Sequence, residues 1–78
     1  MEPQIKDKLI TVAVNIRDYR LYKKHSQEYI AGSLGISQKA YSKIELGSAK
    51  LTFEMLYKIA GILGVPVNDL LGVPSSHV

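Results

Sequence analysis

The stretch that decides the fold is SQEYIAGSLGISQKAYSKIELGS, residues 26–48. It holds two short segments of helical pattern, 27–34 and 38–46, and a serine precedes each of them. Serine is favoured at the N-cap of a helix, so Ser26 and Ser37 predict two helix starts. Gly35 follows the first segment, at the position where a left-handed glycine commonly ends a helix. The stretch therefore predicts two helices joined by a very short turn.

The second segment has two unlike sides. Successive residues of a helix are about 100° apart around its axis, and on this wheel Ala40, Tyr41 and Ile44 fall on one side, which we expect to pack inward. The opposite side carries amides, hydroxyls and ammonium groups but no carboxylate, with Glu45 at the boundary. A solvated helix face is the ordinary interpretation of such a pattern. The outward residues are Gln38, Lys39, Ser42 and Lys43.

The link between the two segments favours a more specific interpretation. Ala31 permits another backbone to approach closely, and Gly35 permits a tight turn. Leu34 and Ile36 stand on either side of that turn and are expected to point inward. Two helices joined by three or four residues form a helix-turn-helix, whose second helix fits the DNA major groove.

Helical periodicity also dominates the rest of the chain. The first predicted helix spans residues 4–23, the fourth spans 53–63 after Thr52 as N-cap, and the fifth spans 67–71 and ends at Gly72. The sequence contains no Asn-Gly or Asp-Gly turn and no sustained alternation of apolar and polar residues, so nothing in it indicates a strand. The sequence predicts an all-α fold of five helices. The inward-facing core is expected at Tyr41, Ile44, Leu56, Ile59, Ala60, Leu63, Leu70 and Leu71.

Composition narrows the possible functions. The 78 residues suffice for one domain, cysteine is absent, and the two histidines lie far apart, so disulfides and a zinc site are not expected. The net charge of +3 and pI of about 9.3 are a weak pointer to nucleic acid. No paired carboxylates, Ser–His pair, phosphate loop or metal set is visible, so we expect neither an enzyme nor a cofactor. Neither a membrane span nor a signal peptide is visible, which predicts a cytoplasmic protein.

Residues 12–71 resemble the Cro and phage-repressor family of helix-turn-helix proteins, also called the XRE type. The resemblance rests on NIRDYR (15–20), SQEYIAGSLGISQKAYSKIELG (26–47), LYKIAGILGV (56–65) and DLL (69–71). It implies a compact five-helix lambda-repressor-like domain that binds operator DNA, usually as a two-fold dimer. Residues 12–72 would form this core, residues 1–11 would extend the first helix, and residues 73–78 would be a flexible tail.

The resemblance and the chemistry together suggest which residues contact DNA. A helix N-terminus is an anion site, and the resemblance implies that Gln27 contacts a phosphate, with support of the helix start as the alternative. Ser37 is expected to cap the third helix and also to reach a phosphate. Glutamine can pair with adenine and lysine with guanine, so the exposed side of the third helix would read bases, although Lys43 could equally contact the backbone. The expected DNA-contacting residues are Gln27, Ser37, Gln38, Lys39, Ser42, Lys43, Ser48 and Lys50, the last two on phosphates from the loop before the fourth helix.

The resemblance also implies a partly buried ion pair between Arg20 and Glu45 that positions the third helix. Loss of either partner would strand the other charge, at a cost of several kcal/mol.

Some positions depart from the family pattern. Lys24 and His25 stand where a Gly or Asn and then an apolar residue are frequent, Leu51 replaces a frequent Pro, and Pro66 replaces a capping Ser or Thr. His25 is expected to be a ring anchored at the surface rather than a switch.

Several apolar residues exceed what one small core needs. We expect that they supply a dimer surface: Ile5, Leu9, Ile10 and Val14, with Met55, Ile62, Val67 and Val73.

The sequence thus predicts a sequence-specific double-stranded DNA-binding protein. It would be a repressor-like transcriptional regulator of a prokaryote or phage that binds a palindromic operator as a homodimer. The alternative is an antitoxin or protein-interaction module of the same fold, whose partner is a toxin or another regulator and whose DNA binding is secondary.

Overall fold

Five α-helices account for the ordered elements that a computed structural model describes, over residues 3–72 with side chains from residue 7 onward. They are α1 (Pro3–Tyr22), α2 (Gln27–Leu34), α3 (Gln38–Glu45), α4 (Phe53–Leu63) and α5 (Val67–Leu71). This part of the chain contains no strand, which confirms the predicted all-α class. The expected tail, 73–78, lies outside the described residues.

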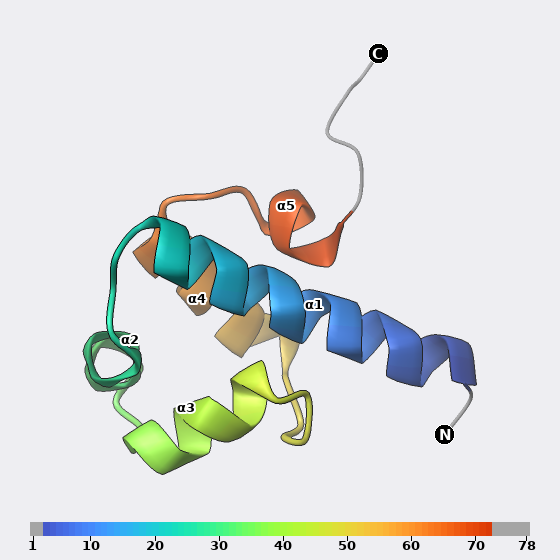
Figure 1. The fold of residues 1–78 in the computed structure, drawn as a ribbon, viewed down its shortest axis with the longest axis horizontal. Helices are drawn as coiled ribbons and strands as arrows, with labels where there is room; N and C mark the ends of the chain where they lie inside the picture. Colours follow the sequence, from blue (N-terminus) through green and yellow to red (C-terminus); the bar gives the residue numbers. More distant parts are fainter. Residues whose placement is uncertain (1–2, 73–78) are drawn as a thin grey trace.

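The helix α1 crosses the middle of the molecule, and the other helices lie beside and behind it (Figure 1). In this view α5 lies on one side of α1, α2 and α3 lie on the other, and α4 lies behind it. The contacts between helices agree with this view, because α1 touches α3, α4 and α5, while α2 packs on α3 and α4. The two helices of the helix-turn-helix therefore lie together at one end and one side of the body.

Local capping explains why the middle helices begin where they do. The hydroxyl oxygen of Ser26 accepts a hydrogen bond from the Tyr29 N–H at 3.0 Å, and that of Ser37 accepts one from the Ala40 N–H at 3.0 Å. Each bond satisfies a donor that the first helical turn leaves free. Thr52 caps α4 in the same way, so all three predicted caps are confirmed.

Some of the predicted helix ends differ slightly from the observed ones. Gly35 ends α2 with φ 75°, in the left-handed region, as predicted. The α3 helix stops at Glu45, one residue earlier than expected, and Leu46 is its C-cap ahead of Gly47 with φ 74°. Pro66 precedes α5 without a side-chain cap, because proline has no polar side-chain atom to offer.

One apolar core joins the five helices. Six large side chains in it are almost fully buried: Ile16, Ile30, Tyr41, Ile59, Leu63 and Leu70. Of the predicted core residues Leu71 is only half-buried, and Ala40 is exposed, so its expected inward position was wrong. The cause is the projection of α3, since Gln38, Lys39 and Ala40 are all exposed and its first turn stands clear of the body.

Candidate nucleic-acid interface

A buried ion pair fixes the end of α3 to α1. The Arg20 Nε donates to Glu45 Oε2 at 2.6 Å and its Nη2 donates to Glu45 Oε1 at 3.0 Å. The remaining Arg20 nitrogen donates to the His25 carbonyl oxygen at 2.9 Å. Both residues are less than a tenth exposed. This two-point geometry is the strong form of an arginine–carboxylate contact, and it orients α3 on the body.

The ion pair also determines the charge state of Glu45. Burial alone would raise the pKa of its carboxyl, but hydrogen bonds from Arg20 and Gln27 and the charge of Arg20 outweigh burial, so the pKa is lowered from its usual value. The hydrogen bond to Glu45 raises the pKa of Arg20. Glu45 is therefore a carboxylate at neutral pH, and Arg20 remains its counter-ion.

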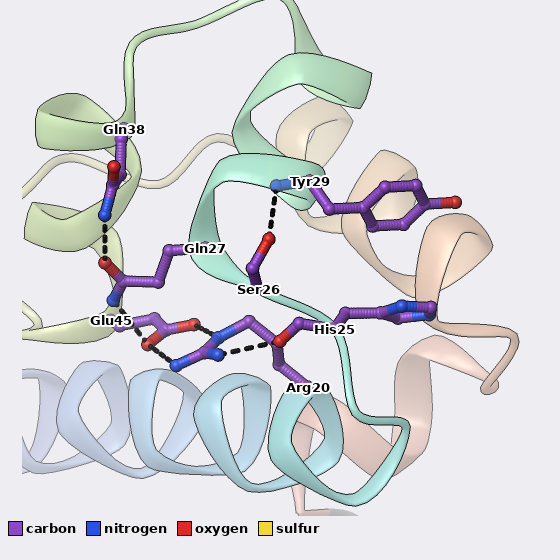
Figure 2. A network of polar contacts seen from close by, with 7 residues as sticks. All are labelled: Arg20, His25, Ser26, Gln27, Tyr29, Gln38 and Glu45. Carbon is purple, nitrogen blue, oxygen red and sulfur yellow. Dashed lines mark hydrogen bonds and ion pairs between the residues drawn. The ribbon is translucent and has the colours of Figure 1, made fainter.

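A second pair of contacts leads from the buried carboxylate to the tip of α3. Gln27 donates from Nε2 to Glu45 Oε1 at 3.0 Å, and its Oε1 accepts from Gln38 Nε2 at 3.4 Å (Figure 2). The first residue of α2 thus bridges the last and first residues of α3. Sequence reasoning did not find this bridge, because Gln27 and Glu45 are 18 positions apart and nothing in the local pattern links them.

The outward side of α3 and the start of α2 form one shallow hollow. Five of the expected DNA-contacting residues line it together with Leu46: Gln27, Gln38, Lys39, Ser42 and Lys43. Its lining includes the exposed Lys39 and Lys43 and no carboxylate, and the carboxylate of Glu45 below it is buried and paired with Arg20. A surface of this chemistry can donate hydrogen bonds to phosphates and to base edges.

Leu46 belongs to this surface, although it was not among the expected site residues. Its side chain is 73% exposed. Helical spacing carried the signal, since Leu46 follows Gln38 and Ser42 at intervals of four and so falls on the same face.

The other expected contacts are spread more widely. Ser37 is exposed and its oxygen is occupied as the α3 cap. Ser48 and Lys50 are exposed in the α3–α4 loop, where they line a separate hollow with Leu9 and Leu51. The Ser48 hydroxyl donates to the Lys43 carbonyl at 3.3 Å, which closes the end of α3.

The turn before α2 is formed by two residues that depart from the family pattern. Lys24 has φ 62°, the only left-handed non-glycine residue in the described chain. His25 is half-buried, and its ring packs on Tyr29 with centroids 4.6 Å apart (Figure 2). A left-handed residue is needed at Lys24, which explains why glycine or asparagine suits that position.

The described residues offer neither a metal site nor a membrane span. The described residues contain no group of three or more metal-ligating side chains, and none of their helices is long and apolar enough to cross a membrane.

A five-helix body that carries a capped, polar helix after a glycine turn is a helix-turn-helix domain. Comparison with known proteins agrees: the helix-turn-helix family matches residues 16–70. The chain therefore belongs to the helix-turn-helix proteins of the Cro and phage-repressor (XRE) type. This is a family of transcriptional regulators and not of enzymes, as the sequence led us to expect.

Relatives share the same region. The chain is 38% identical over 56 residues to the Bacillus subtilis SPbeta prophage-derived uncharacterized HTH-type transcriptional regulator YonR, covering 72% of this chain and 52% of YonR. It is 39% identical over 57 residues to the uncharacterized HTH-type transcriptional regulator YqaE of Bacillus subtilis, covering 73% and 49%.

A third relative has a more specific name. The cryptic phage CTXphi transcriptional repressor RstR of Vibrio cholerae is 29% identical over 63 residues, covering 81% of this chain and 57% of RstR. The chain thus spans about half the length of the curated relatives it matches. No solved structure matches it significantly.

Proposed function

We propose that the protein is a repressor-like transcriptional regulator that binds double-stranded DNA in a sequence-specific manner. The observation that carries the proposal is the outward side of α3, where amide, hydroxyl and ammonium groups gather on one hollow whose lining includes no carboxylate. The name of RstR as a phage transcriptional repressor supports it. Residues 12–72 form the binding unit, residues 3–11 are the N-terminal extension within α1, and the protein acts in the cytoplasm on the nucleoid.

In this proposal α3 lies in the major groove. Gln38 pairs with adenine N6 and N7, and Lys39 donates to guanine O6 and N7. Ser42 and Lys43 follow one turn later, where they contact bases or the adjoining backbone.

Four residues contact the DNA backbone on either side of the groove. They are Gln27 at the N-terminus of α2, Ser37 through its hydroxyl, and Ser48 and Lys50 in the α3–α4 loop. Such contacts fix the register of the protein on the duplex without reading sequence.

The protein is proposed to bind a palindromic operator as a homodimer. Two copies would place their α3 helices in successive major grooves on one face of the DNA, about 34–36 Å apart. Selection of bound sites from random DNA tests binding, symmetry and half-site spacing together. Recovery of a two-fold sequence with half-sites one helical turn apart is expected, whereas recovery of unrelated sequences would reject specific binding.

Fluorescence anisotropy with a selected site provides the affinity. Because lysine–phosphate contacts release counterions, log K should fall linearly with log salt, by roughly 0.9 for each phosphate contacted. Binding that is independent of salt would contradict the proposed interface.

One observation favours the alternative of a protein-interaction module. Phe53 and Tyr57 on α4 are 62% and 57% exposed, and their rings pack edge to face with centroids 4.9 Å apart. Exposed aromatic pairs are common anchors of protein interfaces. A tagged copy expressed in its native host would recover a stable protein partner under this alternative and only DNA under the leading proposal.

A further inference from the structure

The outer face of α1 carries apolar side chains that the described chain covers only in part, Ile10 by the backbone at Gly47. Ile10, Val14 and Leu21 are 45%, 47% and 51% exposed. They are spaced by four and seven residues, so they fall within an arc of about 40° on the helix. We call these three residues the α1 stripe.

The α1 stripe lies between the sides of α1 that face α3 and α5. On one side, Arg20 reaches Glu45 at the end of α3. On the other side, Asn15 donates from Nδ2 to the Leu70 carbonyl in α5 at 3.0 Å. Figure 1 shows the same arrangement, with α3 and α5 on opposite sides of α1 and α4 behind it. The stripe is thus an open seam along α1.

We propose that the α1 stripe is the dimer interface, and that it packs against the α1 stripe of a second copy with the two helices antiparallel. The inference rests on the dimer of the proposed function and adds the surface that forms it.

The spacing of the stripe suits an antiparallel pair. In one register Ile10 lies against the partner's Leu21 at both ends, and the two Val14 side chains lie close to the two-fold axis. Arg17 is exposed beside Val14. Its aliphatic stem can cover the partner's Val14 while the guanidinium remains in water.

The charges at the ends of the seam also match in this register. Asp7 is exposed one turn before Ile10, and Lys24 is exposed just after the end of α1. Antiparallel packing brings Asp7 near the partner's Lys24, and so sets opposite charges together. A parallel pair would instead set Asp7 beside Asp7 and Lys24 beside Lys24, and like charges in register destabilise such a seam.

The symmetry of this dimer is the one that DNA binding needs. An antiparallel pair has a two-fold axis perpendicular to both helices, which here runs through the seam from the α5 side to the α3 side. Rotation about that axis exchanges the two copies but leaves both α3 helices on the same face of the dimer. Both reading surfaces therefore face one duplex.

Cysteine cross-linking tests the contact directly, because the natural chain has no cysteine. The double variant I10C/L21C should form a disulfide-linked dimer on mild oxidation of dilute protein. The single variants I10C and L21C should remain uncross-linked, since identical positions of an antiparallel pair are about 16 Å apart along the axis, too far for a disulfide. The single variant Y57C, similarly exposed on α4, is the matched control and should also remain uncross-linked after oxidation.

Three cross-linking results would contradict the antiparallel α1 interface. Cross-linking of I10C alone would show parallel packing and overturn the proposal, as would efficient cross-linking of Y57C or none in I10C/L21C. Sedimentation equilibrium of V14E gives a second measure: it should shift the full chain to monomer, while Y57E should not, with circular dichroism confirming that both variants are folded.

Failure of this inference can be told from failure of the proposed function. If I10C/L21C forms the dimer but the protein selects no sequence from random DNA, the interface stands and DNA recognition falls. If the protein selects a palindrome but I10C/L21C does not cross-link, DNA recognition stands and the α1 interface falls.

Discussion

Gln27, the first residue of α2, donates a hydrogen bond to Glu45, the last residue of α3, over 3.0 Å. The same glutamine accepts from Gln38 at the other end of α3. A helix that projects from the body is thus held at both ends by one side chain, and the acceptor at its base is a buried carboxylate. The orientation of α3, with the side chains proposed to contact DNA, therefore depends on the Arg20–Glu45 ion pair.

Replacement of Glu45 by glutamine should destabilise the protein by about 3 kcal/mol, because it leaves the Arg20 guanidinium buried without its counter-ion. Urea unfolding followed by circular dichroism measures this. The matched control is E54Q, which breaks the exposed Glu54–Lys58 pair and should cost only about 0.3–0.5 kcal/mol. Equal losses in the two variants would show that the buried pair has no special role.

Stability should depend on pH through the same carboxylate. The pKa of Glu45 is lower in the folded protein than its ordinary value of 4.5. The associated stabilisation is therefore fully present above pH 4.5 and is lost as the pH falls through the lowered folded-state pKa. Unfolding free energies of the natural protein and E45Q, measured from pH 7 down to pH 3, should converge on acidification. A constant difference across the series would contradict the pKa shift.

Base-reading and phosphate contacts should respond differently to substitution. Q38A should relax the preference at one base pair per half-site, with a loss of discrimination of about 1–3 kcal/mol. K50A should weaken all sequences alike and reduce the slope of log K against log salt by about 1. Anisotropy titrations over matched and mismatched sites at several salt concentrations separate the two. A changed sequence preference in K50A would contradict the phosphate contact and indicate that Lys50 contacts a base.

Substitution of Lys24 by glycine should stabilise the fold by roughly 1 kcal/mol, because a left-handed lysine is strained and glycine is not. The backbone of Lys24 has φ 62°, whereas that of its neighbour Lys23 is not left-handed. K23G is therefore the control and should lower the stability by a few tenths to 1 kcal/mol through the entropy of the unfolded chain. Thermal unfolding of the two variants should show shifts of opposite sign.

Local signals explain why most of the fold could be predicted. Ser26, Ser37 and Thr52 each bind a backbone N–H three residues ahead, so the information for a helix start lies within four residues. The glycines that end α2 and α4 act within the same range. Ala40 failed the same reasoning, because its exposure depends on how far α3 projects from the body, and a helical wheel carries no information about that.

The candidate site divides in the same way. The outward direction of Lys39 and Lys43 followed from helical spacing, and the structure places both in the hollow on α3. The bridge through Gln27 could not be foreseen, because it joins side chains that only the packing of α2 on α3 brings together. The exposure of Leu21 was likewise missed, since an apolar residue on a helix appears buried until the neighbours of that helix are known.

The bridge also bears on how such proteins diverge. Within the described chain, the side chains of Lys39, Ser42 and Lys43 make no hydrogen bond to the body, whereas Gln38 is tied through Gln27 to Glu45. The three positions without such a hydrogen bond can therefore be exchanged one at a time without loss of a hydrogen bond to the body. Exchange of Gln38 also removes its hydrogen bond to Gln27, so changes in the proposed DNA preference are expected to arise at positions 39, 42 and 43 first.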